Sequence, residues 1–196
     1  MAAAVREAHE LGRPVTVHAH ATVGMRLAVD AGADGIEHGM FWVEDGVRID
    51  PALADRIAES GTWICPAVGI RPDRQGEHGP PPAVAARLAQ FPAVLAALHA
   101  AGVRLVAGSD AGIGPVKPHD VLPYSIRAMA TGGMSNLDAL RSATSQAALA
   151  CQADDRKGRL APGMDADILA VAGDPLTDLH ALDQVRAVYR AGHRVR

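Results

Sequence analysis

The sequence holds few cysteines and few aromatic residues. Two of its 196 residues are cysteine, Cys65 and Cys151, and 3% are Phe, Trp or Tyr. Two cysteines in so long a chain provide no disulfide framework, so we interpret both as reduced thiols with structural roles. This composition argues against a small secreted scaffold held by disulfides and indicates a reducing compartment.

The sequence also lacks an excess of charge of one sign and a long apolar run. Its net charge is -3 at pH 7, and its basic residues are scattered, which argues against a nucleic-acid partner or an anionic membrane surface. No stretch reaches about 18 uninterrupted apolar residues. Arg6, Glu7 and Glu10 interrupt the N-terminal segment where a signal peptide would need an apolar core. We therefore expect a cytoplasmic protein with no nucleic-acid or membrane partner.

Strand-like runs alternate with helical ones along a chain that is 48% hydrophobic, which is enough for one sizeable core. Strands are expected at residues 14–20, 35–39, 62–66 and 103–110, and helices at 22–32, 50–61, 81–102 with a bend at Pro92, 120–131 and 135–150. Such an alternation is typical of βαβ units around a parallel sheet.

Histidines and an aspartate stand at the ends of these strands. Side chains alternate along a strand, so His18 and His20 of the stretch VTVHAH share one face. We expect them about 6 to 7 Å apart along the strand, too far for their rings to stack on each other but suited to lining one cavity. His38 closes the second strand and Asp110 the fourth. The carboxyl ends of parallel strands meet at one edge, which is where such folds bind ligands.

These residue types indicate a metal site. Two imidazoles from different strands and a carboxylate from a third supply the nitrogen and oxygen ligands that suit zinc with one position open for water. A hydrogen-bonded polar cluster is the alternative that the residues alone leave open.

Four motifs follow one another along the chain: VTVHAHATVGMRLAVDAGADGIEHG, VRLVAGSDAG, NLDALRSATSQAALA and GRLAPGMDADILAVAGDPLTD. In this order they resemble the second half of the metal-dependent amidohydrolase superfamily, in its imidazolonepropionase-like and prolidase-like branch. The resemblance implies an α/β fold: the C-terminal half of a (β/α)₈ TIM barrel, four βα units over residues 1–157, then C-terminal strands of a small β-sandwich over residues 158–196. The family's first-strand His-x-His pair and fourth-strand lysine have no counterpart here, so we expect a truncated form.

The resemblance also implies roles for single residues. His18 matches the metal ligand on the fifth barrel strand, His38 the ligand on the sixth, and Asp110 the aspartate on the eighth. The implied cofactor is Zn²⁺, with one or two divalent metals in the full-length family. His20 would face the substrate or exchange roles with His18. His119 would bind substrate near the site, and a histidine making local hydrogen bonds at a helix start is the alternative.

The segment 67–83, between the third strand and its helix, is rich in glycine, proline and charge. A βα loop of this length is more often functional than not. We therefore expect Arg71, Arg74 or His78 to touch the substrate, with a plain solvated loop as the alternative.

Together these expectations predict a metal-dependent hydrolase of amide C–N bonds in a small dipeptide-like or cyclic amide substrate. Bound zinc would lower the pKa of its water towards about 7. Asp110 would accept the water's proton as general base and pass it to the leaving nitrogen. A non-catalytic half-barrel that binds a ligand or self-associates is the alternative, and open sheet edges predict a homo-oligomer.

Overall fold

The main sheet is built from parallel strands. The structure is a computed structural model that describes residues 1–74 and 80–196, without the side chain of Arg74. The strand β2 (Gly35–Val43) lies between β1 (Thr16–Ala21) and β4 (Trp63–Cys65) and is parallel to both, while β3 (Gly46–Val47) turns back antiparallel on the end of β2. This confirms the predicted parallel sheet.

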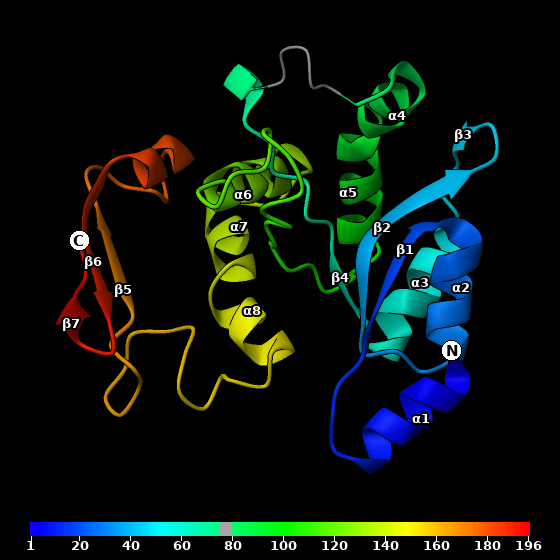
Figure 1. Cartoon of the computed structure of the whole chain (residues 1–196), viewed down its shortest axis with the longest axis horizontal. Coiled ribbons are helices and arrows are strands. Elements are labelled where there is room, and N and C mark those ends of the chain that lie inside the picture. The colour runs from blue at the N-terminus through cyan, green and yellow to red at the C-terminus, as the bar shows by residue number, and fades with distance from the viewer. Residues whose placement is uncertain (75–79) are drawn as a thin grey trace.

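Helices alternate with these strands, as the sequence pattern predicts. They are α1 (Ala2–Glu10), α2 (Thr22–Asp30), α3 (Pro51–Ser60), α4 (Pro82–Leu88), α5 (Phe91–Ala100), α6 (Leu122–Thr131), α7 (Asn136–Ser142) and α8 (Ser145–Ala150), with 3₁₀ turns η1 (Pro72–Arg74) and η2 (Leu179–Asp183). Figure 1 shows α6, α7 and α8 between the main sheet and a second, smaller sheet.

Local sequence signals explain where α3 begins and ends. The Asp50 carboxylate accepts a hydrogen bond from the Leu53 amide at 3.1 Å, Pro51 occupies the first turn, and Gly61 closes the helix at φ 72°. A side-chain cap, an early proline and a left-handed glycine are the three signals that delimit a helix.

One face of the main sheet carries the core. Ile36 of β2 and Ile64 of β4 are fully buried against α2 and α3, which contribute Met25 and Leu53. Because side chains alternate along a strand, His18, Glu37 and Cys65 lie on the opposite face. The helices therefore cover one face and leave the other to line a cavity.

The helix α1 is fastened to the sheet by Asp34, which stands just before β2. Its carboxylate accepts hydrogen bonds from the His9 ring at 2.8 Å and from the Val15 amide at 2.7 Å. Burial raises the pKa of Asp34, but these two hydrogen bonds outweigh it and hold the pKa below the ordinary value of 3.8.

Four elements differ from the sequence prediction. The expected strand 35–39 continues as β2 to Val43, so His38 lies within the strand rather than at its end. The expected strand 103–110 forms one parallel bridge, between Leu105 and Ile64, since the Ala107 amide bonds to Ser142 rather than to a further strand. The expected helix 81–102 is broken before Phe91, and the expected helix 135–150 is broken after Ser142.

A second sheet follows, made of β5 (Ile168–Val171), β6 (Val185–Arg190) and β7 (His193–Arg194), all antiparallel. Figure 1 shows it at the far side of α6 to α8. The turn η2 between β5 and β6 ties it to the main body, because Leu179 and Leu182 belong to the same core as the parallel sheet.

The segment Pro82–Ala100 is long and apolar enough to cross a membrane by length and composition alone, with a mean hydropathy of 1.3 and 22% of that window buried. It comprises two helices, and Val94, Leu95 and Leu98 of α5 are buried in the core. A core helix passes the same test, so one such segment is weak evidence for a membrane span.

Candidate functional site

Three histidines converge beside the main sheet, His18 and His20 from β1 and His38 from within β2. One nitrogen from each of His18, His20 and His38 lies within 4.8 Å of the other two. The ring of His18 meets those of His20 and His38 edge-on, at 4.8 Å and 4.6 Å between centroids, and His20 stacks on His38 at 4.2 Å. The planes of the His18 and His20 rings are 87° apart, so the two rings contact edge-on and do not stack on each other, as expected.

The backbone of β2 is bent to bring His38 into this cluster. His38 has φ 75° and the following Gly39 has φ 63°. A left-handed conformation costs a non-glycine residue about 1–3 kcal/mol and is found preferentially at functional sites. This left-handed conformation turns the His38 side chain away from the face that Ile36 occupies and towards His18 and His20.

The cluster favours neutral imidazoles. Burial, followed by the charges of His38 and His18, lowers the pKa of His20 to about 4. Burial and the charge of His18 also lower the pKa of His38, although Asp110 opposes this. His20 Nδ1 is buried and has no hydrogen-bond partner among the described residues. Neutral nitrogens with free lone pairs are the form in which histidine binds divalent metals.

Asp110 lines the same cavity as the histidines and is paired with a buried lysine. Its Oδ2 lies 3.4 Å from Lys117 Nζ, and Lys117 also donates to the Ala67 carbonyl. Both Asp110 and Ala67 have left-handed backbones, with φ 50° and 52°. Sequence reasoning missed Lys117. Its one signal in the sequence is its position, seven residues after the strand-end aspartate Asp110 and between apolar and turn residues.

A cavity of about 580 Å³ opens beside the histidines. Its ionisable residues are the three histidines, Asp110 and Lys117, and the rest of its described wall is apolar apart from the indole nitrogen of Trp42. That wall comprises Met40, Trp42, Ala67, Val68, Ile70, Val84, Leu88, Phe91, Pro92, Ile113 and Ala128. The site therefore joins a polar cluster to a large apolar surface.

Trp42 is a second residue that sequence reasoning missed. Its indole stacks on His20 at 4.5 Å between centroids, and the Arg87 guanidinium lies over the same ring at 5.2 Å. Arg87 in turn donates to the Glu44 carbonyl at 2.7 Å. Because the His20 ring of β1 and the Arg87 cation of α4 both contact it, Trp42 fixes the plane of His20.

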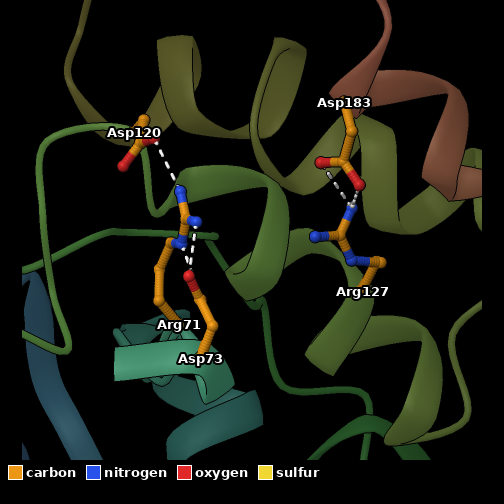
Figure 2. Close-up of polar contacts among 5 residues, drawn as sticks. All are labelled: Arg71, Asp73, Asp120, Arg127 and Asp183. Carbon is orange, nitrogen blue, oxygen red and sulfur yellow. Dashed lines mark hydrogen bonds and ion pairs between the residues drawn. The ribbon is translucent and has the colours of Figure 1, made fainter. Parts of the chain in front are cut away.

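Arg71, which we expected to touch substrate, lies outside the lining of this cavity. Figure 2 shows its guanidinium between Asp73 and Asp120, at 2.8 Å and 3.0 Å, and a second pair between Arg127 and Asp183. Arg71 therefore fastens the loop after β4 to the loop before α6.

Two other predictions of substrate contact concern His119 and the pair Arg74 and His78. His119 is exposed and is not among the residues that line the cavity. The side chain of Arg74 and all of His78 lie outside the described residues. The substrate-binding roles of Arg71, His20 and His119 stay predictions.

Residues 1–195 match the sequence profile of the amidohydrolase family. The chain belongs to this family. A protein of Mycobacterium tuberculosis named as uncharacterized is 30% identical over 188 residues, which is 88% of this chain and 45% of that protein. Ochratoxinase of Aspergillus niger is 26% identical over 191 residues, or 94% of this chain and 38% of the enzyme.

Solved structures agree with this assignment and place the chain in the prolidase-like branch. A Xaa-Pro dipeptidase with bound methionine superimposes with a TM-score of 0.84 at 29% identity, over 100% of this chain and 48% of the dipeptidase. A prolidase in complex with N-methylphosphonate-L-proline gives a TM-score of 0.80 at 28% identity, over 100% and 48%. The amidohydrolase chain described here thus spans about half the length of the relatives it matches.

Proposed function

We propose that the intact protein is a metal-dependent hydrolase of amide bonds, and that this chain forms the second half of its (β/α)₈ barrel. The observation that carries the proposal is the convergence of His18, His20 and His38 within 4.8 Å from two neighbouring parallel strands. In a chain of the amidohydrolase family, such a cluster is best explained as part of a metal centre.

The residues fit a divalent metal such as Zn²⁺. Three imidazole nitrogens are a donor set that zinc prefers, and the buried Nδ1 of His20 lacks any other partner among the described residues. Bound there, the metal would supply an acidified water and polarise the amide carbonyl. Replacing each of the three histidines and Asp110 in turn tells which of them bind the metal.

Asp110 is the residue of this chain best suited to move a proton. Its Oδ2 faces Lys117, which leaves Oδ1 to accept a proton from the attacking water. The same carboxyl group can then donate that proton to the leaving nitrogen as the C–N bond breaks. Lys117 would hold the carboxylate in place during both transfers, because Lys117 is itself anchored to the Ala67 carbonyl.

The substrate we propose is a small amide or dipeptide-like molecule. Relatives named as a Xaa-Pro dipeptidase and a prolidase favour this class. A cavity of about 580 Å³ is within the usual range for small-molecule sites.

Zinc binding by the full chain tests the proposal. Equilibrium dialysis followed by elemental analysis should give one Zn²⁺ per chain, and His18→Ala, His20→Ala and His38→Ala should each weaken binding by at least about tenfold. Asp110→Asn tells a ligand from a base, since only a ligand's loss should weaken binding as strongly. His193→Ala, an exposed histidine on β7, is the matched control and should bind as wild type. Equal zinc content in wild type and His38→Ala would refute the metal centre.

Self-association is a second proposal, favoured by the sheet edges. The outer edge of β1 and the outer side of the Leu105 bridge pair with no strand of the described chain. Open edges of this kind attract further strands. Sedimentation at micromolar concentrations should show dimers or larger species, and a clean monomer would overturn this proposal.

A further inference from the structure

The cavity beside the histidine cluster has an apolar wall that amide hydrolysis does not itself require. We propose that this wall binds a large, uncharged apolar group of the substrate, so that this half of the site selects amides without a carboxylate there. This inference rests on the proposed function, because the apolar group is part of a substrate only if the protein hydrolyses amides.

The size of the cavity sets the size of the group. Its volume is about 580 Å³, whereas a water molecule takes up about 30 Å³ of liquid. A metal ion and its waters would therefore fill a small part of it. The remaining space is sufficient for an aromatic ring or a branched aliphatic chain beside the scissile amide.

Two elements contribute most of the aliphatic wall. Val68 and Ile70 come from the loop after β4, and Val84 and Leu88 from α4. Val84 and Leu88 are four residues apart and so lie on one face of their helix. Both are only half-buried, so an apolar ligand would remove their remaining surface from water, which favours binding.

Among the described lining residues, no free lysine or arginine is left to pair with a carboxylate. Lys117 is the one lysine or arginine among the described lining residues, and it is already bound to Asp110 and to the Ala67 carbonyl. Asp110 would repel a second carboxylate. A charged group taken from water into this space would lose its hydration without compensation.

Three ligands that differ at one position test the inference on the full chain. They are N-(2-phenylethyl)benzamide, its carboxylate derivative N-benzoylphenylalanine, and the neutral N-benzoylphenylalaninamide, which has the size of the acid. Dissociation constants are measured by calorimetry in EDTA, so that neither metal nor turnover is needed. Both neutral amides should bind at least about tenfold more tightly than the acid.

Variants of α4 locate the effect. Val84→Lys places a cation in the wall and should shrink or reverse the preference, whereas Ala85→Lys puts the same charge on the exposed side of the helix and should leave it unchanged. Val84→Ala adds no charge and should weaken both neutral amides by about threefold to tenfold. Circular dichroism verifies that each variant is folded.

Equal or tighter binding of the acid, binding of none of the three ligands, or equal effects of Val84→Lys and Ala85→Lys would overturn the inference. Its failure is separable from failure of the proposed function. Loss of zinc binding with the ligand preference intact would refute the metal centre and still support the apolar wall. Zinc-dependent hydrolysis together with tighter binding of the acid would support the proposed function and refute the apolar wall.

Discussion

Lys117 is the site residue whose replacement should most reduce the free energy of unfolding. It is 8% exposed and reaches two acceptors, the Ala67 carbonyl and Asp110 Oδ2. Lys117→Met keeps the apolar stem and removes the ammonium. The buried Ala67 carbonyl then loses its charged donor, and Asp110 loses its cation.

The two contacts set the magnitude. A hydrogen bond to a charged group contributes about 1.5–3 kcal/mol. The ion pair is longer, at 3.4 Å, and the Asp110 side chain is 36% exposed, so solvent screening limits its share to at most about 1 kcal/mol. Since the methionine side chain recovers part of the loss by packing, we expect Lys117→Met to lower the free energy of unfolding by about 2–3 kcal/mol.

Urea unfolding in EDTA, followed by circular dichroism, measures this difference. The matched control is Lys157→Met, which removes a lysine paired with Asp165 at 2.9 Å and with Asp167. Solvent reaches Lys157 and screens its ion pairs, so its loss should reduce the free energy of unfolding much less than the loss of Lys117. Equal losses in the two variants, or a Lys117→Met protein within about 0.5 kcal/mol of wild type, would refute the reasoning.

Three further predictions use other parts of the chain. Burial and the neighbouring Glu37 raise the pKa of Cys65 to about 12, so a thiol reagent at pH 8 should label the exposed Cys151 rapidly and Cys65 only on unfolding, as mass spectrometry would show. Trp42→Leu should weaken zinc binding in the dialysis assay, because His20 loses its stacking partner, while Trp42→Phe should retain most of it. The stability difference between wild type and Asp34→Asn should be constant from about pH 5 to 7 and shrink as pH falls below 3.8, because the folded-state pKa of Asp34 is lowered and its stabilisation is lost through that lower pKa; urea titrations across this range measure it.

Strand periodicity and strand order predicted four of the residues that line the cavity. Alternation alone places His18 and His20 on one face of β1, and the parallel order of the strands places His38 and Asp110 at the same edge. The structure lines one cavity with all four side chains. These are short-range consequences of local sequence, which is why they can be derived without coordinates.

Contacts between distant segments could not be predicted in this way. Lys117 reaches Ala67 across 50 residues, and Arg87 reaches Trp42 across 45, through loop geometry that no local pattern specifies. The fourth strand was over-predicted for a related reason. Its apolar run is strand-like, but it forms one bridge to Ile64 before the Ala107 amide bonds to the distant Ser142 carbonyl, a contact that no local pattern predicts.

The position of His38 depends both on strand alternation and on a backbone conformation that alternation does not predict. Ile36 is 1% exposed and faces the helices, so simple alternation would send His38, two residues on, to the same face and away from His18 and His20. The left-handed φ of 75° at His38 reverses that outcome. Gly39 makes the turn feasible, because it shares the left-handed conformation and because a Cβ there would lie 2.9 Å from the Ile64 side chain. The backbone thus holds a conformation costing about 1–3 kcal/mol, secured on either side by the buried Ile36 and Met40. Its effect on the described chain is to complete the group of three imidazoles, so this strain is itself an argument for function that is independent of family resemblance.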